Sequence, residues 1–529
     1  MEIFSVYNNP VSWISTTVVL LLTTLWFLLR RRRRRSPPGP GWWPIPWLQF
    51  HWSSAPAVKC SQWADKYGDV FSVRLGTKQV VVLSGAKVAR ESFVSNESVF
   101  SGRPDSWPFK RLNRSLALST RDYDKIWKRQ RAFTLSVHRN FGVDNNLNLD
   151  DVIREEVTHF TDAIGKIQGE AFRLDKYTMK AAVNVLGAIL FDSRFDYEDA
   201  KLEELVQTLT ELHTLLKKSD TMFTYMPFSW HLLWCRRRRL RRSYARLLNA
   251  LSVLAQEKEQ TTGTQKMRHA LDMYTREVAI QEGGERSIFE GDDDPKESLR
   301  HMLAEYFYLG AVPIAKTIET LFTQMVNRPE VQKRVRKEIR EMRFLNGHRT
   351  PTVEDIENSH FSYATILEVL RLNPLEPLGW PRCATQPGEI DGYAIGRGTV
   401  ILANTQAIHR DPQFWKDPEE FNPERFIDRS AGKVIENAAF MPWSVGPRKC
   451  PGEMVSRLVV WSFFASVMQK YQLLAPVEKD RTRGFLNGLN VFNRGRKAGT
   501  RTSKICAVSH EDEDRLDNNL NHKDQLEKM

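Results

Sequence analysis

The stretch Trp443-Ser-Val-Gly446-Pro-Arg448-Lys-Cys450-Pro-Gly452 lies near the C-terminal end of the chain. The residues after it are apolar almost all round, which predicts a buried helix. Cys450 would then precede the first turn of a core helix, where free N–H groups and the helix dipole favour a thiolate. A thiolate behind a turn that glycine lets approach closely is a good soft ligand for iron. The alternative is a buried structural cysteine, the commoner fate of a free cysteine.

Four positions of this stretch decide between the two interpretations. Gly446, Arg448, Cys450 and Gly452 match the pattern Phe-x-x-Gly-x-Arg-x-Cys-x-Gly, with Trp443 at the phenylalanine position. The stretch therefore resembles the cysteine loop of the cytochrome P450 family. The resemblance implies a mostly α fold with small β-sheets (α+β) and haem b as the cofactor. It also implies that Cys450 is the axial ligand of the haem iron and that Arg448 pairs with a haem propionate.

Two upstream stretches supply further candidates for cofactor binding. Trp127 and Arg131 are four residues apart, so they share one helix face. Alone, this spacing is typical of a solvated basic face with one anchored tryptophan. It resembles the Trp-x-x-x-Arg of the family's third helix, which implies that both side chains reach a propionate, and a guanidinium fork suits a carboxylate. The run Trp380-Pro-Arg382 resembles the family's strand entry, where a basic residue contacts a propionate.

A second pair of motifs points to the scaffold beneath the cofactor. Glu368 and Arg371 are three residues apart on one predicted helix and can pair. A surface ion pair is the common alternative. The family's Glu-x-x-Arg has this spacing, and its partner arginine belongs to a Pro-Glu-Arg-Phe motif, present here at residues 423–426. The resemblance implies a largely buried structural triad of Glu368, Arg371 and Arg425.

The central helix departs from the family pattern. A long helical pattern covers residues 296–327, where the family's oxygen-activating helix is expected. Its centre usually reads Ala-Gly-x-Asp/Glu-Thr-Thr, and the acid and first threonine relay protons to dioxygen. Residues 309–314 read Leu-Gly-Ala-Val-Pro-Ile, so that Gly310 matches while Val312 replaces the acid and Pro313 replaces the threonine.

This departure has chemical consequences. Neither valine nor proline can deliver a proton over hydrogen-bond distance. Pro313 also removes a backbone N–H and should sharpen a kink over the cofactor, lined by Gly310, Ala311, Val312 and Pro313. Thr317 and Glu319 lie a turn or more further along, so neither is expected to substitute for the missing groups.

Three functions follow from an intact cysteine loop with an altered relay. The first is a monooxygenase that inserts one oxygen atom of O2 into a lipophilic substrate with electrons from NADPH–cytochrome P450 reductase, or with cytochrome b5 as a second donor. The second is an O2-independent isomerase or dehydratase of peroxides or oxygenated lipids, which bring their own O–O bond. The third is a weakly active haem-binding relative.

Substrate contacts are expected from apolar and aromatic side chains in the regions that line the family's pocket. The candidates are Phe109, Phe223, Tyr225, Phe307 and Leu375.

The N-terminal end predicts a membrane anchor. Val11–Leu29 has 19 residues without a charge, enough to span a bilayer, and six arginines follow at Arg30–Arg35. The positive-inside rule places these arginines and the rest of the chain in the cytosol. A cleaved signal peptide is the alternative, but the charges lie on the wrong flank. The Pro-Pro-Gly-Pro hinge resembles that of microsomal members, which implies a single-pass anchor in the endoplasmic reticulum membrane.

Composition and local patterns complete the expected organisation. The 529 residues are 41% hydrophobic and 27% charged, as in globular proteins, and the five scattered cysteines fit a reducing compartment. The net charge of +13 includes a basic run at 236–242 after an aromatic stretch, a combination typical of a lipid-facing surface. Nucleic-acid binding is not expected, because no reading fold accompanies the charge. We expect an anchor with its basic stop at 1–35, a Pro/Trp-rich hinge at 36–48, the haem domain at 49–506 and a disordered polar tail at 507–529.

Regular elements are predicted from periodicity. A β-hairpin is expected from the runs Val70–Leu75 and Gln79–Leu83, and helices from the patterns at 150–167, 179–190, 202–217, 244–258, 296–327, 363–372 and 451–471.

Overall fold

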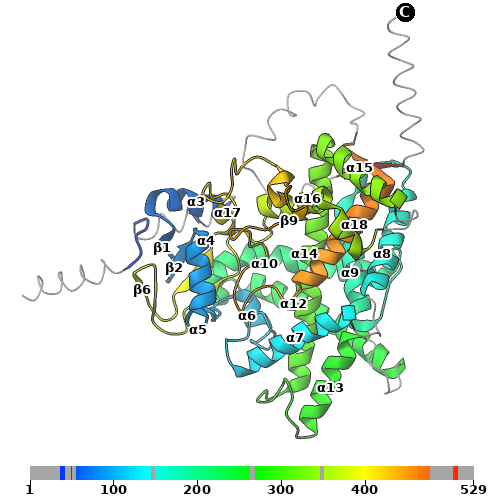
Figure 1. Cartoon of the computed structure of the whole chain (residues 1–529). Helices are drawn as coiled ribbons and strands as arrows, with labels where there is room; N and C mark the ends of the chain where they lie inside the picture. Colours follow the sequence, from blue (N-terminus) through cyan, green and yellow to red (C-terminus); the bar gives the residue numbers. More distant parts are fainter. Residues whose placement is uncertain are drawn as a thin grey trace, which may run out of the picture.

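The computed structural model describes residues 36–41, 49–50, 55–143, 149–261, 269–345, 351–476 and 504–509. Helices dominate these residues, and short strands form small sheets, mainly beside the helical part (Figure 1). The predicted mostly α architecture with small sheets is confirmed. The predicted membrane span at 11–29 lies outside the described residues, within which no helix is both long enough and apolar enough to cross a bilayer.

The central helix α14 (Pro295–Asn327) organises the helical part. It begins where expected, because the Asp294 side chain accepts a hydrogen bond from the Glu297 N–H at 3.0 Å and Pro295 fits the first turn. The helix continues through Pro313 as a single element. It packs against α9 (Leu174–Phe191) and α18 (Glu453–Lys470).

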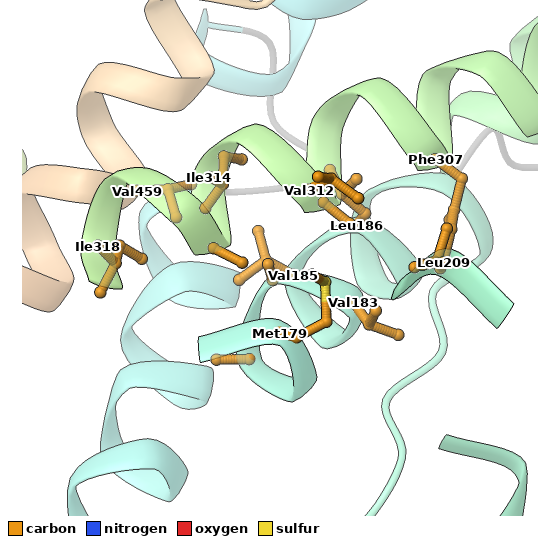
Figure 2. Close-up of a cluster of buried hydrophobic side chains, with 14 of the residues drawn as sticks. Met179, Val183, Val185, Leu186, Leu209, Phe307, Val312, Ile314, Ile318 and Val459 are labelled. Atoms are coloured by element: carbon orange, nitrogen blue, oxygen red, sulfur yellow. The ribbon is translucent and has the colours of Figure 1, made fainter. Parts of the chain in front are cut away.

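Figure 2 shows the apolar cluster that joins these three helices, with side chains of α14, α9 and α18 brought together. The contact with α9 is close at Gly310, where a Cβ would lie 2.4 Å from Leu186 Cδ1. The predicted apolar helix after Cys450 is confirmed as α18, which buries its residues on nearly every side.

The remaining helices surround this core or connect it to the sheets. Their bounds are α3 (Pro56–Tyr67), α4 (Ala86–Arg90), the π-helix η2 (Glu91–Ser95), α5 (Glu97–Phe100), α6 (Pro108–Leu112), α7 (Lys125–Val143), α8 (Leu149–Gly165), α10 (Ala200–Tyr225), α11 (Ser229–Leu232), α12 (Trp234–Thr261), α13 (Ala270–Glu282), α15 (Pro329–Leu345), the 3-10 helix η3 (Val353–Asn358), α16 (His360–Leu372), α17 (Thr405–Ile408) and the 3-10 helix η4 (Pro423–Phe426).

The largest sheet places one of the candidate residues. Its strand order is β1-β2-β7-β4, and the predicted hairpin is confirmed as β1 (Val70–Leu75) and β2 (Lys78–Leu83). The strand β7 (Val400–Ala403) runs parallel to β2 and carries β4 (Arg382–Cys383) on its other side, with Arg382 opposite Ile401. This pairing holds Arg382 at the edge of the sheet. Its side chain faces residues 443–452, which are called the thiolate loop below.

A second sheet corrects one predicted boundary. Its order is β10 (Tyr471–Leu474), β11 (Lys504–Ser509) and β3 (Phe172–Arg173). The polar tail was predicted to begin at residue 507, but Ala507 pairs with Leu473 inside β11 and is 5% exposed. The prediction was wrong here because the two apolar residues after Cys506 continue the strand before the charged residues begin. Two short pairs remain, β5 (Gly388–Ile390) with β6 (Tyr393–Ile395) and β8 (Ile427–Asp428) with β9 (Lys433–Val434).

Helix α16 and η4 bring Glu368, Arg371 and Arg425 together. The Arg371 Nε and Nη2 atoms donate to the Glu368 carboxylate at 2.7 and 2.8 Å, and the Arg425 Nε donates to it at 3.1 Å. The side chains of Glu368 and Arg371 have no exposed surface. Arg371 also donates to the carbonyls of His409 and Pro418, at 2.7 and 2.8 Å. Every charge in the group therefore has partners, as buried charges require.

We expect Arg371→Ala to destabilise the fold strongly, because it leaves the Glu368 carboxylate buried with too few donors. Removing one partner of a buried charge pair costs about 3–5 kcal/mol. The exposed Arg429, which pairs with Glu424, provides the control, since Arg429→Ala should change stability by less than about 1 kcal/mol. Melting temperature and haem content of the two purified variants measure the difference. Equal values would contradict a structural role for the buried triad.

Candidate functional site

The thiolate loop is shaped by Gly446. Its φ of +73° lies in the left-handed region, and a Cβ there would stand 1.9 Å from the carbonyl oxygen of Phe93. Only glycine fits this backbone and this close approach. Two backbone hydrogen bonds close the loop, in which the Lys449 N–H donates to the Gly446 carbonyl and the Cys450 N–H donates to the Trp443 carbonyl, both at 2.9 Å. The loop thereby delivers Cys450 just before α18.

Cys450 keeps exposed surface, although protein atoms also surround it closely. Burial raises the pKa of its thiol, while a hydrogen bond from the Gly452 N–H and the charges of Arg131 and Lys449 lower it. The sequence predicted a lowered pKa from the helix start alone. In the protein part of the site, loss of hydration outweighs this effect of the helix terminus. A bound cation at the sulfur is what would reverse the balance.

Four buried or half-buried guanidinium groups, called the arginine cluster below, gather beside this loop. They belong to Arg103, Arg131, Arg382 and Arg448. Arg448 donates to the carbonyls of Ser101, Leu118 and Arg121 at 3.0, 3.2 and 2.6 Å. Arg382 donates through Nη2 to Ser444 Oγ and the Val445 carbonyl, at 3.0 and 2.8 Å. Arg131 donates to the Lys449 carbonyl at 2.6 Å.

The cluster has little negative charge near it, since the buried Glu305 influences Arg103 and Arg448 only without an ion pair. Within the described part of the chain, no carboxylate forms an ion pair with any of its four members. Burial, and then the like charges of the neighbouring arginines, hold the pKa values of Arg382 and Arg448 well below the usual range. The buried Nη1 of Arg382 has no hydrogen-bond partner. A ligand with carboxylates beside Cys450 would satisfy this nitrogen and relieve the repulsion, so the site fits the two propionates of haem.

Trp127 and Arg131 share one face of α7, as predicted, but their roles differ. The buried indole N–H of Trp127 donates to the Leu118 carbonyl at 2.9 Å. The ring instead packs under two guanidinium groups, with Arg448 at 4.3 Å and Arg131 at 5.5 Å from its centroid. A buried N–H takes the nearest acceptor, and the ring face is left to stabilise cations.

The altered stretch of α14 divides between core and site. Val312 is 4% exposed and lies in the apolar cluster with Leu186 of α9 (Figure 2). Ala311 is also buried, whereas Gly310 and Pro313 are half-buried. The Thr317 hydroxyl donates to the Pro313 carbonyl at 2.8 Å. Thr317 therefore already uses its hydroxyl hydrogen within the helix, and no side chain from 310 to 313 carries a proton to donate.

The residues predicted to contact substrate have differing surroundings. Phe307 is fully buried against Phe191 of α9, with ring centroids 6.4 Å apart. Its neighbour Tyr308 instead meets Phe109, at 5.7 Å. Sequence alone did not distinguish these two adjacent aromatic residues, because both fit an apolar helix face.

The aromatic residues at the end of α10 also have other partners. Phe223 packs on Trp230, with centroids 5.0 Å apart, and Tyr225 packs on Phe50, at 6.0 Å. Leu375 is 41% exposed.

Three functional candidates were missed by sequence reasoning. Arg103 joins the arginine cluster, and the run Phe100-Ser-Gly-Arg-Pro could have signalled it. Glu305 of α14 is buried, which raises its pKa to about 7, and it accepts a hydrogen bond from the Ser119 N–H at 2.7 Å. His409 accepts from the Met441 N–H at 3.0 Å and contacts the Arg371 carbonyl, also at 3.0 Å. No local pattern marks the last two, because their partners are distant in sequence.

Comparison with known proteins agrees with the site. The profile of the family named Cytochrome P450 matches residues 37–491. The similar curated proteins include cytochrome P450 2J2 of Homo sapiens, which is 30% identical over 477 residues, 89% of this chain and 91% of that protein. Cytochrome P450 2D1 of Rattus norvegicus is 30% identical over 462 residues, 85% and 88% of the two chains. Cytochrome P450 2U1 of Mus musculus is 29% identical over 422 residues, 79% and 78%.

A cysteine lies just before a buried helix, and beside it are arginines without carboxylate partners among the described residues. This arrangement is typical of a haem-thiolate protein. The chain belongs to the cytochrome P450 family, whose members are haem-thiolate monooxygenases. Its cofactor is haem b, held through a cysteine thiolate.

The two glycines of the thiolate loop should respond differently to the same change. Gly446→Ala forces a side chain into a left-handed backbone, which alone costs roughly 1–3 kcal/mol, and into the Phe93 carbonyl. Gly452→Ala meets nothing within 4 Å and has a φ of −88°. We therefore expect low haem content and a lowered melting temperature for Gly446→Ala, and near wild-type values for Gly452→Ala. A well-folded, haem-replete Gly446→Ala protein would contradict the described loop geometry.

Proposed function

We propose that the protein is a membrane-bound monooxygenase that inserts one oxygen atom of O2 into a small lipophilic substrate, with Cys450 as the axial ligand of its haem. The observation that carries the proposal is the arginine cluster, which has no carboxylate ion pair within the described residues and lies beside an accessible Cys450. Arg382 and Arg448 would hold the propionates, with Arg131 and Arg103 next to them. Bound haem supplies the activation of dioxygen, and the chain supplies the thiolate, the anchors and the shape of the cavity.

The membrane and the electron donor belong to the same proposal. Before and at the start of α12, Phe228, Leu232 and Trp234 are 47%, 69% and 55% exposed, and the arginines of 236–242 follow. Apolar residues beside basic ones favour contact with anionic lipid. A single-pass anchor at 11–29 in the endoplasmic reticulum would keep this surface at the membrane and the catalytic domain in the cytosol. NADPH–cytochrome P450 reductase would supply the electrons, with cytochrome b5 as the second candidate.

Proton delivery is the step in which this chain differs from the pattern expected of its family. Residues 310–313 offer no hydroxyl and no acid, and the Thr317 hydroxyl is engaged with the Pro313 carbonyl. The proposal therefore requires protons from water or from a hydroxyl of the substrate. Such a relay would be less efficient than a positioned side chain, which raises the rate of a step with proton transfer by about 10²–10⁴-fold.

The same observation favours a second candidate function. An isomerase or dehydratase of peroxides or oxygenated lipids needs no delivered protons, so Val312 and Pro313 would cost it nothing. A weakly active haem-binding protein is the remaining alternative. The intact thiolate loop, with its glycine in the required backbone conformation, argues against simple loss of function.

We expect Cys450→His to abolish the carbon-monoxide difference band that is characteristic of thiolate-ligated haem, because imidazole would replace the thiolate at the iron. The exposed Cys235→Ser should leave the band unchanged and serves as the control. Spectra of the reduced proteins measure both. An unchanged band in Cys450→His would refute the assignment of the ligand.

The functional meaning of Pro313 is best tested by Pro313→Thr compared with Pro313→Ala. Both restore a helix N–H, but only threonine adds a hydroxyl. For a monooxygenase with an impaired relay, Pro313→Thr should raise product formed per reductant consumed, by on the order of tenfold, and lower peroxide release. Pro313→Ala should not. Val312 is left unchanged, because an aspartate there would be buried in the apolar cluster without partners.

Each other outcome of this experiment has its own meaning. Wild-type turnover already tightly coupled to reductant would mean that water or the substrate completes the relay. Efficient reductant-free isomerisation of a lipid hydroperoxide, unaided by Pro313→Thr, would favour the second candidate function.

A further inference from the structure

A buried histidine and tyrosine connect the thiolate loop to the central helix. His138, near the end of α7, is 3% exposed. Its Nδ1 lies 2.9 Å from the carbonyl oxygen of Pro451, the residue after Cys450. Its Nε2 is hydrogen-bonded to the hydroxyl of Tyr306 on α14. The two rings meet edge to face, with centroids 5.3 Å apart.

The partners fix the direction of both hydrogen bonds. A carbonyl oxygen can only accept, so Nδ1 carries the hydrogen and donates it to Pro451. Burial lowers the pKa of His138 to about 4, so the ring is neutral near pH 7 and Nε2 must accept. The Tyr306 hydroxyl then donates, and burial, with smaller effects of Tyr274 and Cys450, keeps it protonated by raising its pKa well above the usual range. The result is one directed chain from Tyr306 through His138 to the Pro451 carbonyl.

The chain has a mechanical consequence for the loop. The peptide between Pro451 and Gly452, whose N–H bonds to the Cys450 sulfur, is held from outside α18 by a ring whose other nitrogen is bonded to α14. The loop's own hydrogen bonds, to the Gly446 and Trp443 carbonyls, hold the peptides before the cysteine. His138 thus supplies an external contact on the C-terminal side of Cys450 in the chain.

We propose that His138 is a positioning residue for the thiolate loop, which it ties to Tyr306 of the central helix through the Pro451 carbonyl. The proposal rests on the function proposed above, in which Cys450 is the haem ligand. His138 does not touch reacting atoms. Its role is to keep the Pro451–Gly452 peptide in one place, so that the sulfur stays at bonding distance and the hydrogen bonds around it stay constant.

The test compares full-length haem-loaded variants by spectroscopy and electrochemistry rather than by turnover. His138→Leu removes both hydrogen bonds and leaves the Pro451 carbonyl and the Tyr306 hydroxyl unpartnered. We expect the thiolate carbon-monoxide band to be lost roughly tenfold faster on mild warming, as two lost hydrogen bonds imply, together with a shifted haem reduction potential. His138→Asn should restore both properties in large part, because its amide N–H can still reach the Pro451 carbonyl. Tyr306→Phe, which keeps that bond, should show a smaller effect.

The matched control is His301→Leu. His301 is also 3% exposed and also bonded to a tyrosine, with Nδ1 2.8 Å from the Tyr244 hydroxyl, but it does not contact the thiolate loop. This variant should keep the wild-type band lifetime and potential.

The outcomes separate this inference from the proposed function. A wild-type protein without a thiolate band would refute Cys450 as the ligand. A wild-type protein with the band, but with His138→Leu unchanged in band lifetime and potential, would refute the positioning role alone. So would His138→Asn as impaired as His138→Leu, which would assign the loss to packing. If His138→Leu does not fold, the decision passes to Tyr306→Phe, and a wild-type lifetime and potential in that variant would overturn the proposal.

Discussion

The buried carboxylate of Glu368 is the constraint on which the candidate site depends. A charge without exposed surface must be matched by donors, and Arg371, Arg425 and the Asn422 N–H supply them. The hydrogen bonds continue from this group. The Arg371 carbonyl contacts one ring nitrogen of His409, and the other ring nitrogen accepts from the Met441 N–H, just before the thiolate loop. A continuous set of hydrogen bonds thus connects the base of the fold to the residues that present Cys450.

Beside the thiolate loop, in contrast, positive charge is in excess. The arginine cluster gathers cations that repel one another and rest on backbone carbonyls, with one nitrogen of Arg382 left unpaired. Dianionic haem would add the missing negative charge where these groups converge. Because a ligand that binds only the folded state stabilises it, cofactor binding and folding are thermodynamically linked in this protein. The site is in this sense incomplete by electrostatics, even though its backbone is already in place.

Sequence reasoning succeeded where the signal is local and stopped where partners are distant. The bounds of α14 were predicted to within one residue, because Asp294 and Pro295 mark its start and Arg328-Pro329 its end. The hairpin β1–β2 and the apolar helix α18 followed from periodicity in the same way. The structure also brings Glu368, Arg371 and Arg425 together, as expected from motifs in family order. The choice of Leu118 as acceptor for Trp127, the inward turn of Phe307 and the bond between His138 and Pro451 depend on tertiary neighbours that no short pattern encodes.

Pro313 also changes the mechanics of the helix that carries it. It lacks the N–H that would bond the Leu309 carbonyl, so α14 loses one backbone hydrogen bond near the middle of its 33 residues. The half before Pro313 is tied to α12 through His301 and to α10 through Tyr308, and the half after it packs with α18 around Ile314 and Ile318, while α9 contacts both halves (Figure 2). A helix that lacks a backbone hydrogen bond bends more easily at that point, so motion of one half is transmitted poorly to the other. Displacement of α10 and α12 by an entering molecule would therefore reach Tyr306, which lies on the same side of Pro313 as His301 and Tyr308, more readily than it would reach Ile318.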